Sequence, residues 1–290
     1  MSKAEYFRYL EPAALGVVFL ALLVFDFTAP LRARKRKVFG RFFTNFWLSL
    51  GAFVVGTAVV KPVSRGLAEW TSLHSFGVLY AVPMSAGVRF VAGFLLMDLS
   101  FYYWHRLNHE VPLLWRFHNV HHVDPDLDVT TSFRFHFGEI LYSTVFRVVQ
   151  VGLIGLAPLT YIVYEFLFQA ETMFHHSNVR LPIRVERLLN KVIVTPRMHG
   201  IHHSVVRDET NSNYSVIFRW WDLLHRTLRL NVPQSGITIG IPAYLGDEDN
   251  NVVKLLALPF KGQRDYWHSE DGAVPQREPT TGEEPFVLAQ

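Results

Sequence analysis

The chain has 290 residues, of which 50% are hydrophobic and 18% are charged, which is more apolar than one soluble core needs and favours an integral membrane protein. Its 28 Lys and Arg residues stand against 25 Asp and Glu residues, and this small excess argues against a nucleic-acid partner. Cysteine is absent, so disulfides and thiol chemistry are excluded and any bound metal must take nitrogen or oxygen ligands.

Two apolar runs near the amino terminus predict helices that cross a bilayer. The first covers 12–29, and the second covers 42–60 and is expected to close at Lys61-Pro62. The densest basic cluster of the chain, at 32–37, lies between them, and the positive-inside rule places it in the cytoplasm. No small-residue cleavage site follows the first run, so we interpret it as a retained anchor and not as a secretory signal.

Later apolar segments predict that the chain returns to the cytoplasmic side. A third span begins near Arg89 and runs into His105, after a stretch at 76–88 that is typical of an interfacial or re-entrant piece. Two shorter apolar stretches, 140–158 and 159–174, predict a helical hairpin that dips into or crosses the bilayer. Counting crossings from the basic cluster places His105 and the histidines that follow it on the cytoplasmic side.

The predicted fold is therefore an all-α integral membrane protein under a cytosolic helical cap that holds a dinuclear metal site. We expect about four transmembrane helices, with re-entrant pieces allowed in the third and fourth. The expected division is into membrane helices at 1–104, a histidine-rich catalytic region at 105–230 and a polar segment at 231–290. The Pro, Gly and Glu-rich tail around 275–285 is typical of disorder.

Eleven of the 14 histidines fall between positions 105 and 203. Eight of them form one H-x-x-x-H motif and two H-x-x-H-H motifs: His105 and His109; His118, His121 and His122; His199, His202 and His203. Helical residues at i, i+3 and i+4 share one face, so each motif presents its imidazoles side by side. Eight imidazoles exceed the coordination number of one ion and imply two metals. Imidazole suits Zn, Cu, Fe and Ni, so ligand type alone does not choose among them.

One acidic residue shares a helix face with the first histidine motif. Asp98, Tyr102, His105 and His109 follow one another at spacings of four, three and four. A carboxylate in a membrane helix costs about 2.5 to 3.5 kcal/mol on insertion scales, so it needs a partner. The N–H of a metal-bound imidazole is a good partner, and we predict that Asp98 orients one of the ligands.

Seven short motifs follow one another between 98 and 227: HRLNH, LWRFHNVHH, TSFRFHFGE, FHHSNVRLP, TPRMHGIHHS, SNY and WD. This series resembles the fatty acid hydroxylase and sterol desaturase superfamily of membrane di-iron enzymes. The resemblance implies a four-helix membrane stem under a cytosolic cap, with two irons held by the three histidine motifs. It also implies a further histidine before Ser177-Asn178, a role that falls on His176, with His175 as the adjacent candidate.

The resemblance leaves the roles of several residues open. Asn178 either contacts a metal through water or caps a turn. His136 and Glu139 match an R-x-H-x-x-E stretch of the family, and whether His136 binds metal stays open. The family usually ends this region with W-D-x-x-F-G-T, whereas His225 and Arg226 stand here in place of Phe and Gly. That replacement affects the local cap or substrate entrance and leaves the metal site intact.

These features predict a membrane-bound di-iron oxygenase that hydroxylates or desaturates a lipid C–H bond with O2 and two electrons. The chain shows no flavin, haem or Fe–S signature, so we expect an external donor, a reductase, ferredoxin or cytochrome b5-like protein, to dock on the cap. One alternative is a dinuclear zinc lipid hydrolase, although the H-E-x-x-H arrangement is missing. The other is a non-enzymatic metal transporter or store, which would place histidines within the spans.

Overall fold

The computed structural model describes residues 3–277, and all of its named elements are helices. The longer ones are α1 (Lys3–Thr28), α2 (Val38–Val55), α3 (Lys61–Leu73), α5 (Ala86–Glu110), α6 (Pro112–His122), α7 (Phe137–Ile154) and α8 (Pro158–His176). The shorter ones are α4 (Val78–Ala81), α9 (Ile183–Leu189), α10 (Pro196–His202), α11 (Arg207–Thr210), α12 (Trp220–His225) and α13 (Val252–Ala257), with 3-10 turns η2 (Val129–Phe133), η3 (Gln234–Gly236), η4 (Pro242–Tyr244), η5 (Asp247–Asn250) and η6 (Leu258–Phe260). Between residues 3 and 277 only isolated β-bridges occur, so the predicted all-α fold is confirmed.

The second predicted span does not end where the sequence suggested. The expectation that Lys61-Pro62 closes it is wrong, because α2 continues through a π-helical turn, η1 (Gly56–Val60), into α3. A proline lacks the N–H that an α-helix needs and would clash with the preceding turn. Here the Lys61 N–H donates to the Gly56 carbonyl, five residues back, and this wider turn directly precedes Pro62. The helix therefore passes the proline and runs on to Leu73.

Three segments within residues 3–277 are long and apolar enough to cross a membrane. They are Leu10–Thr28, Val38–Ala81 and Phe137–Ile154. The first two correspond to the predicted spans, and the third is the first arm of the predicted hairpin. Helix α5, which carries the predicted third span, and helix α8 do not meet this criterion, so the count of about four stays a prediction.

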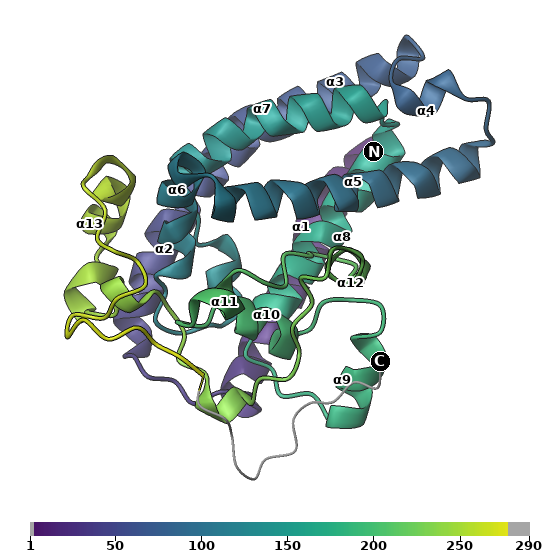
Figure 1. Cartoon of the computed structure of the whole chain (residues 1–290). Helices are drawn as coiled ribbons and strands as arrows, with labels where there is room; N and C mark the ends of the chain where they lie inside the picture. The colour runs from purple at the N-terminus through teal and green to yellow at the C-terminus, as the bar shows by residue number, and fades with distance from the viewer. Residues whose placement is uncertain (1–2, 278–290) are drawn as a thin grey trace.

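The long helices form a stem, and the short helices that follow α8 are gathered at one end of it, while α4 lies at the other (Figure 1). Figure 1 shows α3, α5 and α7 running alongside one another, with α1 and α8 directed toward the short helices. The predicted hairpin is present as α7 and α8, joined by a turn at Gly155, where φ is +75°. A Cβ atom on Gly77 would lie 2.3 Å from the Gly155 Cα, so the 76–88 segment packs against this turn only because both residues are glycines.

The basic segment after α1 is bound to the histidine-bearing end of the molecule. The Arg32 guanidinium donates to the Gln234 side chain over 2.7 Å, and the Arg32 backbone N–H donates to the Asn178 side chain over 2.9 Å. The backbone N–H groups of Lys35 and Arg36 donate to the carboxylate of Asp126. The basic cluster and the histidines therefore lie at the same end of the stem, as the counting of crossings requires.

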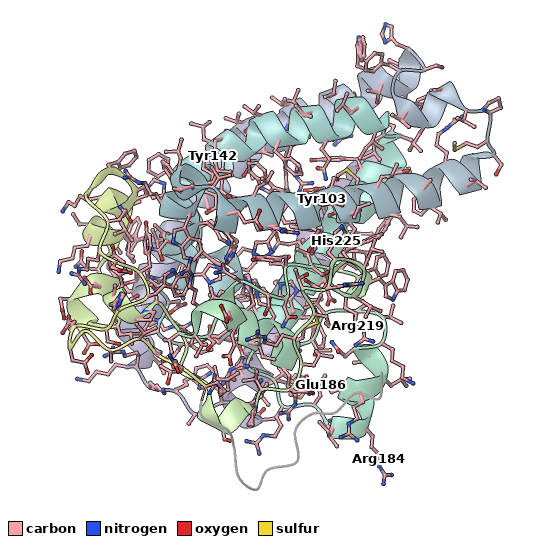
Figure 2. The ribbon with its side chains drawn as sticks, viewed as in Figure 1. Tyr103, Tyr142, Arg184, Glu186, Arg219 and His225 are labelled. Carbon is pink, nitrogen blue, oxygen red and sulfur yellow. The ribbon has the colours of Figure 1, made fainter. Side chains whose placement is uncertain are left out.

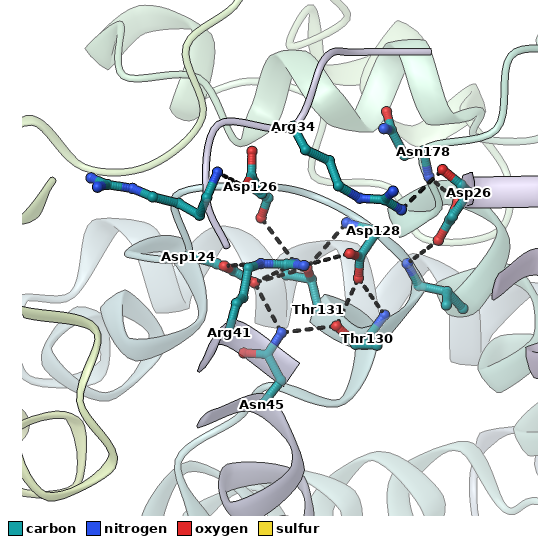
Figure 3. Close-up of polar contacts among 12 residues, drawn as sticks. Asp26, Arg34, Arg41, Asn45, Asp124, Asp126, Asp128, Thr130, Thr131 and Asn178 are labelled. Carbon is teal, nitrogen blue, oxygen red and sulfur yellow. Dashed lines mark hydrogen bonds and ion pairs between the residues drawn. The ribbon is translucent and has the colours of Figure 1, made fainter. Parts of the chain in front are cut away.

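A buried ionic network joins the start of α2 to the loop after α6 (Figure 3). Arg41 donates to both oxygens of Asp124, over 2.6 and 2.9 Å, and also pairs with Asp128. Burial raises the pKa of Asp124, but the guanidiniums of Arg41 and Arg134 lower it more, so it lies below its ordinary value. Because Asp124 follows His122 by two residues, this network fixes the loop that leaves the second histidine motif.

The C-terminal part of the described chain, 231–277, contains only short turns and helices and packs on the cap. Arg277 illustrates this, since its guanidinium pairs with the buried carboxylate of Glu209 at 2.7 Å. The predicted tail around 275–285 falls mostly at 278–290, which lies outside the described residues. The division of the chain at 104 and 230 stays a prediction.

We predict that Arg41→Met lowers the free energy of unfolding by about 3 to 5 kcal/mol, because it leaves the buried carboxylate of Asp128 without its cation and that of Asp124 with only the Arg134 guanidinium, 3.9 Å away. Thermal unfolding of the protein in detergent measures the loss. Arg65→Met is the matched control, since Arg65 forms an exposed pair with Glu69 on α3, for which we expect a change of about 0.5 kcal/mol or less. Equal effects of the two substitutions would contradict the assigned role of Arg41.

Candidate metal centre

The predicted histidine ligands converge where the ends of four helices meet. α5 carries the first motif near its C-terminus, α6 ends at His122, α8 ends at His176 and α10 ends at His202. The local sequence sets these positions, because α6, α8 and α10 each have a proline in their first turn, where its missing N–H costs nothing. The prolines thus fix where these helices begin, and the last turns of the helices meet at one point.

The ring nitrogens of nine histidines fall into two groups, and within each group one nitrogen of every ring lies within 4.8 Å of the others. The first group contains His105, His109, His118, His122 and His202, and the second contains His121, His176, His199 and His203. All nine predicted ligands are therefore brought together, and each belongs to one group.

Each H-x-x-H-H motif divides its histidines between the two groups. The first and last histidines of a motif enter one group and the middle one enters the other, so His121 is separated from its neighbour His122. Around a helix, residue i+4 lies about 40° from residue i, while i+3 lies about 60° away on the opposite side. The prediction that each motif presents its imidazoles side by side did not include this division, although the same angles imply it.

A backbone carbonyl fixes the orientation of each of four rings. The Nδ1–H groups of His105 and His202 donate to the carbonyls of Tyr214 and Ser212, over 2.8 and 2.7 Å. The Nδ1–H groups of His121 and His176 donate likewise to the carbonyls of Arg134 and Thr172. Because a carbonyl only accepts, each Nδ1 carries the hydrogen and each Nε2 presents a lone pair.

These lone pairs face one another at short range. The Nε2 atoms of His105 and His202 are 3.1 Å apart, and those of His121 and His176 are also 3.1 Å apart. Two acceptors cannot form a hydrogen bond with each other, so each pair needs a cation to which both lone pairs bind. Two ligands at right angles around a metal with bonds of about 2.1 Å lie about 3.0 Å apart. The residues present therefore fit a bound metal ion.

A carboxylate holds a fifth ring. The Nδ1–H of His118 donates to Oε1 of Glu139 over 2.8 Å, and the His118 Nε2 is buried without a hydrogen-bond partner among the described residues. His136, whose role was open, belongs to neither group. Its Nδ1 accepts from the Gly138 N–H at the start of α7, and its Nε2 lies 3.2 Å from the Leu256 carbonyl. His136 caps α7, and so places Glu139 in the first turn of that helix.

The two polar residues expected to orient ligands hold backbone groups. Asp98 accepts from the Phe218 N–H at 3.0 Å and from the indole N–H of Trp221 at 2.7 Å. Among the described residues no hydrogen bond joins Asp98 to an imidazole, so the expected contact is wrong, because the 217–221 segment supplies its donors. The Asn178 side chain accepts from the Arg32 N–H and donates to the Arg32 carbonyl, so it binds a distant backbone segment, a role that neither alternative considered for it included.

His175 lies beside the two groups and belongs to neither. Its ring centroid is 4.1 Å from that of His199 and 4.7 Å from that of His176. The residue therefore packs against two rings of the second group, and its part in holding a metal stays a prediction.

Comparison with known proteins adds an independent observation. Residues 90–227 match the family model described as fatty acid hydroxylase. Over these residues, which are a little under half of the chain, the sequence is similar to the fatty acid hydroxylase family. The matched range contains all nine histidines of the two groups, so the resemblance carried by the short motifs is confirmed.

Three relatives of different kinds show how far the similarity extends. The ornithine lipid hydroxylase OlsE of Rhizobium tropici is 32% identical over 220 residues, which cover 74% of this chain and 63% of that protein. Human cholesterol 25-hydroxylase is 30% identical over 47% of this chain and 49% of its own length. Human alkylglycerol monooxygenase is 27% identical over 51% of this chain and 32% of its own length. The chain thus spans from 32% to 63% of the length of these relatives, and no solved structure matches it.

The family's W-D motif acts on the metal centre through the backbone. The Asp222 carboxylate accepts from the N–H groups of Tyr214 and Ser215, over 2.8 and 2.9 Å. It thereby fixes the segment whose carbonyls hold His105 and His202, a link that sequence reasoning missed although the motif itself was visible. Arg226 stands where the family usually has glycine, and it adopts φ +59°, in the left-handed region that favours glycine.

Burial keeps the rings of His122, His202 and His203 neutral. Burial lowers the pKa of His202 to about 3, and burial together with neighbouring rings lowers the pKa of His122 and His203 well below the ordinary value. A neutral imidazole is the form that binds metal, so the centre is ready for a cation at neutral pH.

We predict that metal-free protein loses stability as the pH falls below about 6.5, the ordinary pKa of histidine. The reason is that an unfolded chain takes up protons there, while the folded chain, with lowered histidine pKa values, does not. Thermal unfolding between about pH 7.5 and pH 5.5 measures the effect. Replacing His122 and His203 together by Asn should make the profile shallower, and an unchanged slope would count against buried neutral imidazoles.

Proposed function

We propose that this chain is a membrane-bound oxygenase that hydroxylates a C–H bond of a lipid, with two iron ions held by the nine histidines of the two groups. The observation that carries the proposal is the pair of facing acceptors in each group, which requires a cation at two places. The hydroxylases and the monooxygenase among its relatives act on lipids by their names, and this supports the choice of reaction.

Iron is the metal that fits both the ligands and the reaction. Imidazole accepts Zn, Cu, Fe and Ni, but zinc has no redox chemistry and could serve only hydrolysis. Bound iron would supply the activation of O2 and the removal of hydrogen from an unactivated carbon. The five histidines of the first group and the four of the second would hold one ion each.

The chain's own part is to orient, to exclude water and to place the lipid. The carbonyls of Tyr214, Ser212, Arg134 and Thr172 fix ring orientation, and Glu139 does the same for His118. Burial of the rings keeps solvent from the centre. Helices α5 and α8 run from the stem directly to the two groups, so a lipid tail in the stem would present its carbons to the centre.

We further propose a multi-pass arrangement with the centre at the cytoplasmic side. The three apolar segments would cross the bilayer with α5 and α8 beside them, giving about four transmembrane helices. The basic segment 32–37 sets the orientation by the positive-inside rule, and it is bonded to the histidine-bearing end. The two electrons for each turnover would come from a separate cytosolic donor, a reductase, ferredoxin or cytochrome b5-like protein.

The decisive experiment combines metal analysis, O2 uptake and lipid mass spectrometry on the purified protein in lipid with a reductant. We expect two iron ions per chain, oxygen consumption that depends on lipid, and a lipid that gains the mass of one oxygen. Zinc without oxygen consumption would indicate a hydrolase, and bound metal without turnover would indicate a store, so either result overturns the proposal. A loss of two hydrogens would replace hydroxylation by desaturation.

We predict that His121→Ala lowers bound metal and abolishes the lipid product, because it removes one nitrogen from the second group. The matched control is His136→Asn, which keeps a capping side chain at the start of α7 and lies outside both groups. It should retain both metals and most of the activity. Equal metal loss in the two variants would show that His136 is a ligand and that the two groups are wrongly assigned.

The Glu139 carboxylate gives a finer test of ligand orientation. We predict that Glu139→Leu weakens metal binding by about 10- to 100-fold, since His118 loses the acceptor that orients it. Glu139→Gln keeps an oxygen at that position and should lose much less. The rate at which metal passes to a chelator measures both variants, and similar rates would mean that Glu139 does not act through His118.

A further inference from the structure

The cap carries an exposed apolar surface that the catalytic proposal does not use. It is formed by large apolar side chains of two neighbouring segments, and we call it the α9–α12 surface: Leu188, Val192, Trp220, Leu223 and Leu224. The indole N–H of Trp220 donates to the Lys191 carbonyl over 3.2 Å, and the Arg219 N–H donates to the Val192 carbonyl over 3.1 Å. These bonds make the two segments one continuous surface, on the side of the molecule where Figure 1 shows α9 and α12 beside α8.

This surface lies beside the stem and not above the histidines. The Trp220 ring stacks on that of Phe218 at 4.4 Å, and Phe218 packs against Phe94 of α5 with ring centroids 6.0 Å apart. Phe94 precedes His105 by eleven residues, which is about 16 Å along a helix. Trp220 is therefore linked to the side of the stem and not to the metal centre, and its outer face is uncovered.

The exposed charges around this surface all have one sign. In the segments 180–192 and 217–230 they are Arg180, Arg184, Lys191, Arg226 and Arg229. The acidic residues of the same segments, Glu186 and Asp222, are buried, and their carboxylates bind Arg197 and backbone N–H groups. Figure 2 shows Arg184 pointing away from the body of the molecule. These basic residues form a rim around the apolar surface. Such a surface is complementary to an apolar environment that has negatively charged groups at its edge.

We propose that the α9–α12 surface is immersed in one bilayer leaflet, with its basic rim at anionic phospholipid headgroups. The inference rests on the proposed membrane embedding of the stem. Tryptophan at the headgroup level, leucines below it and basic residues around them are typical of an interfacial helix. Each basic residue near an anionic surface adds about 1 kcal/mol of attraction. A second copy is the weaker occupant, because a two-fold contact would bring two basic rims together.

The absence of cysteine allows a direct test with single cysteines. Leu188→Cys and Leu224→Cys place a nitroxide spin label on the surface of the full-length protein, reconstituted in vesicles of phosphatidylcholine and phosphatidylglycerol. Val145→Cys, exposed on α7 within an apolar segment, is the control for the stem. Asp208→Cys is the control for water, because its neighbour Arg207 lies over Trp267, which stacks on Trp115 beside His109 at the far end of α5.

Power saturation compares how often each label collides with O2, which concentrates in lipid, and with a nickel chelate, which stays in water. We expect the O2-to-chelate ratio at positions 188 and 224 to exceed that at 208 several-fold and to approach that at 145. Ratios at 188 and 224 equal to that at 208, with a high ratio at 145, would overturn this inference alone. A low ratio at 145 would overturn the membrane embedding itself. Spin–spin broadening at 188 and 224 would identify a second copy and also overturn the inference.

Discussion

Two imidazole lone pairs that face each other at 3.1 Å are the constraint on which the rest of this structure depends. Each such pair repels unless a cation lies between its members, and hydrogen bonds from Nδ1 prevent either ring from turning a donor inward. Each of the two groups contains one such pair, and both pairs are buried. A helix bundle that needed these positions only for packing would have apolar side chains there. The facing histidines are therefore explained by binding of a cation and not by a contribution to the stability of the fold.

A rigid backbone is needed to hold the rings in these positions. The carbonyls of Tyr214 and Ser212 can orient their histidines only if the 212–215 segment is fixed, and the Asp222 carboxylate fixes it through two backbone N–H groups. The loop after His122 is fixed in turn by Asp124 and Arg41. His105, His202 and the loop after His122 thus depend on residues far from them in sequence, so their surroundings are complete only when distant segments have come together.

The sequence was sufficient wherever the cause is local. Spacings of three and four placed His118, His121 and His122 on one side of a helix, and all nine predicted ligands meet. It was insufficient where partners come from distant segments: the donors of Asp98 are supplied by residues 217–221, which no local pattern connects to α5. The passage of the helix through Pro62 was missed for another reason, because a π-helical turn leaves no signal in hydropathy.

The buried acidic residues bear on the charge balance of a metal centre whose ligands are neutral. Nine uncharged imidazoles would leave the charge of two divalent cations uncompensated in a region of low dielectric, where charge matters most. One carboxylate lies directly on a ligand, because Glu139 accepts from the Nδ1–H of His118. Asp98 and Asp222 are buried in the surrounding scaffold, where N–H donors hold them. Hydrogen bonds of this kind keep a carboxylate in place without cancelling its charge. The Glu139 carboxylate therefore both orients His118 and supplies negative charge beside the first group.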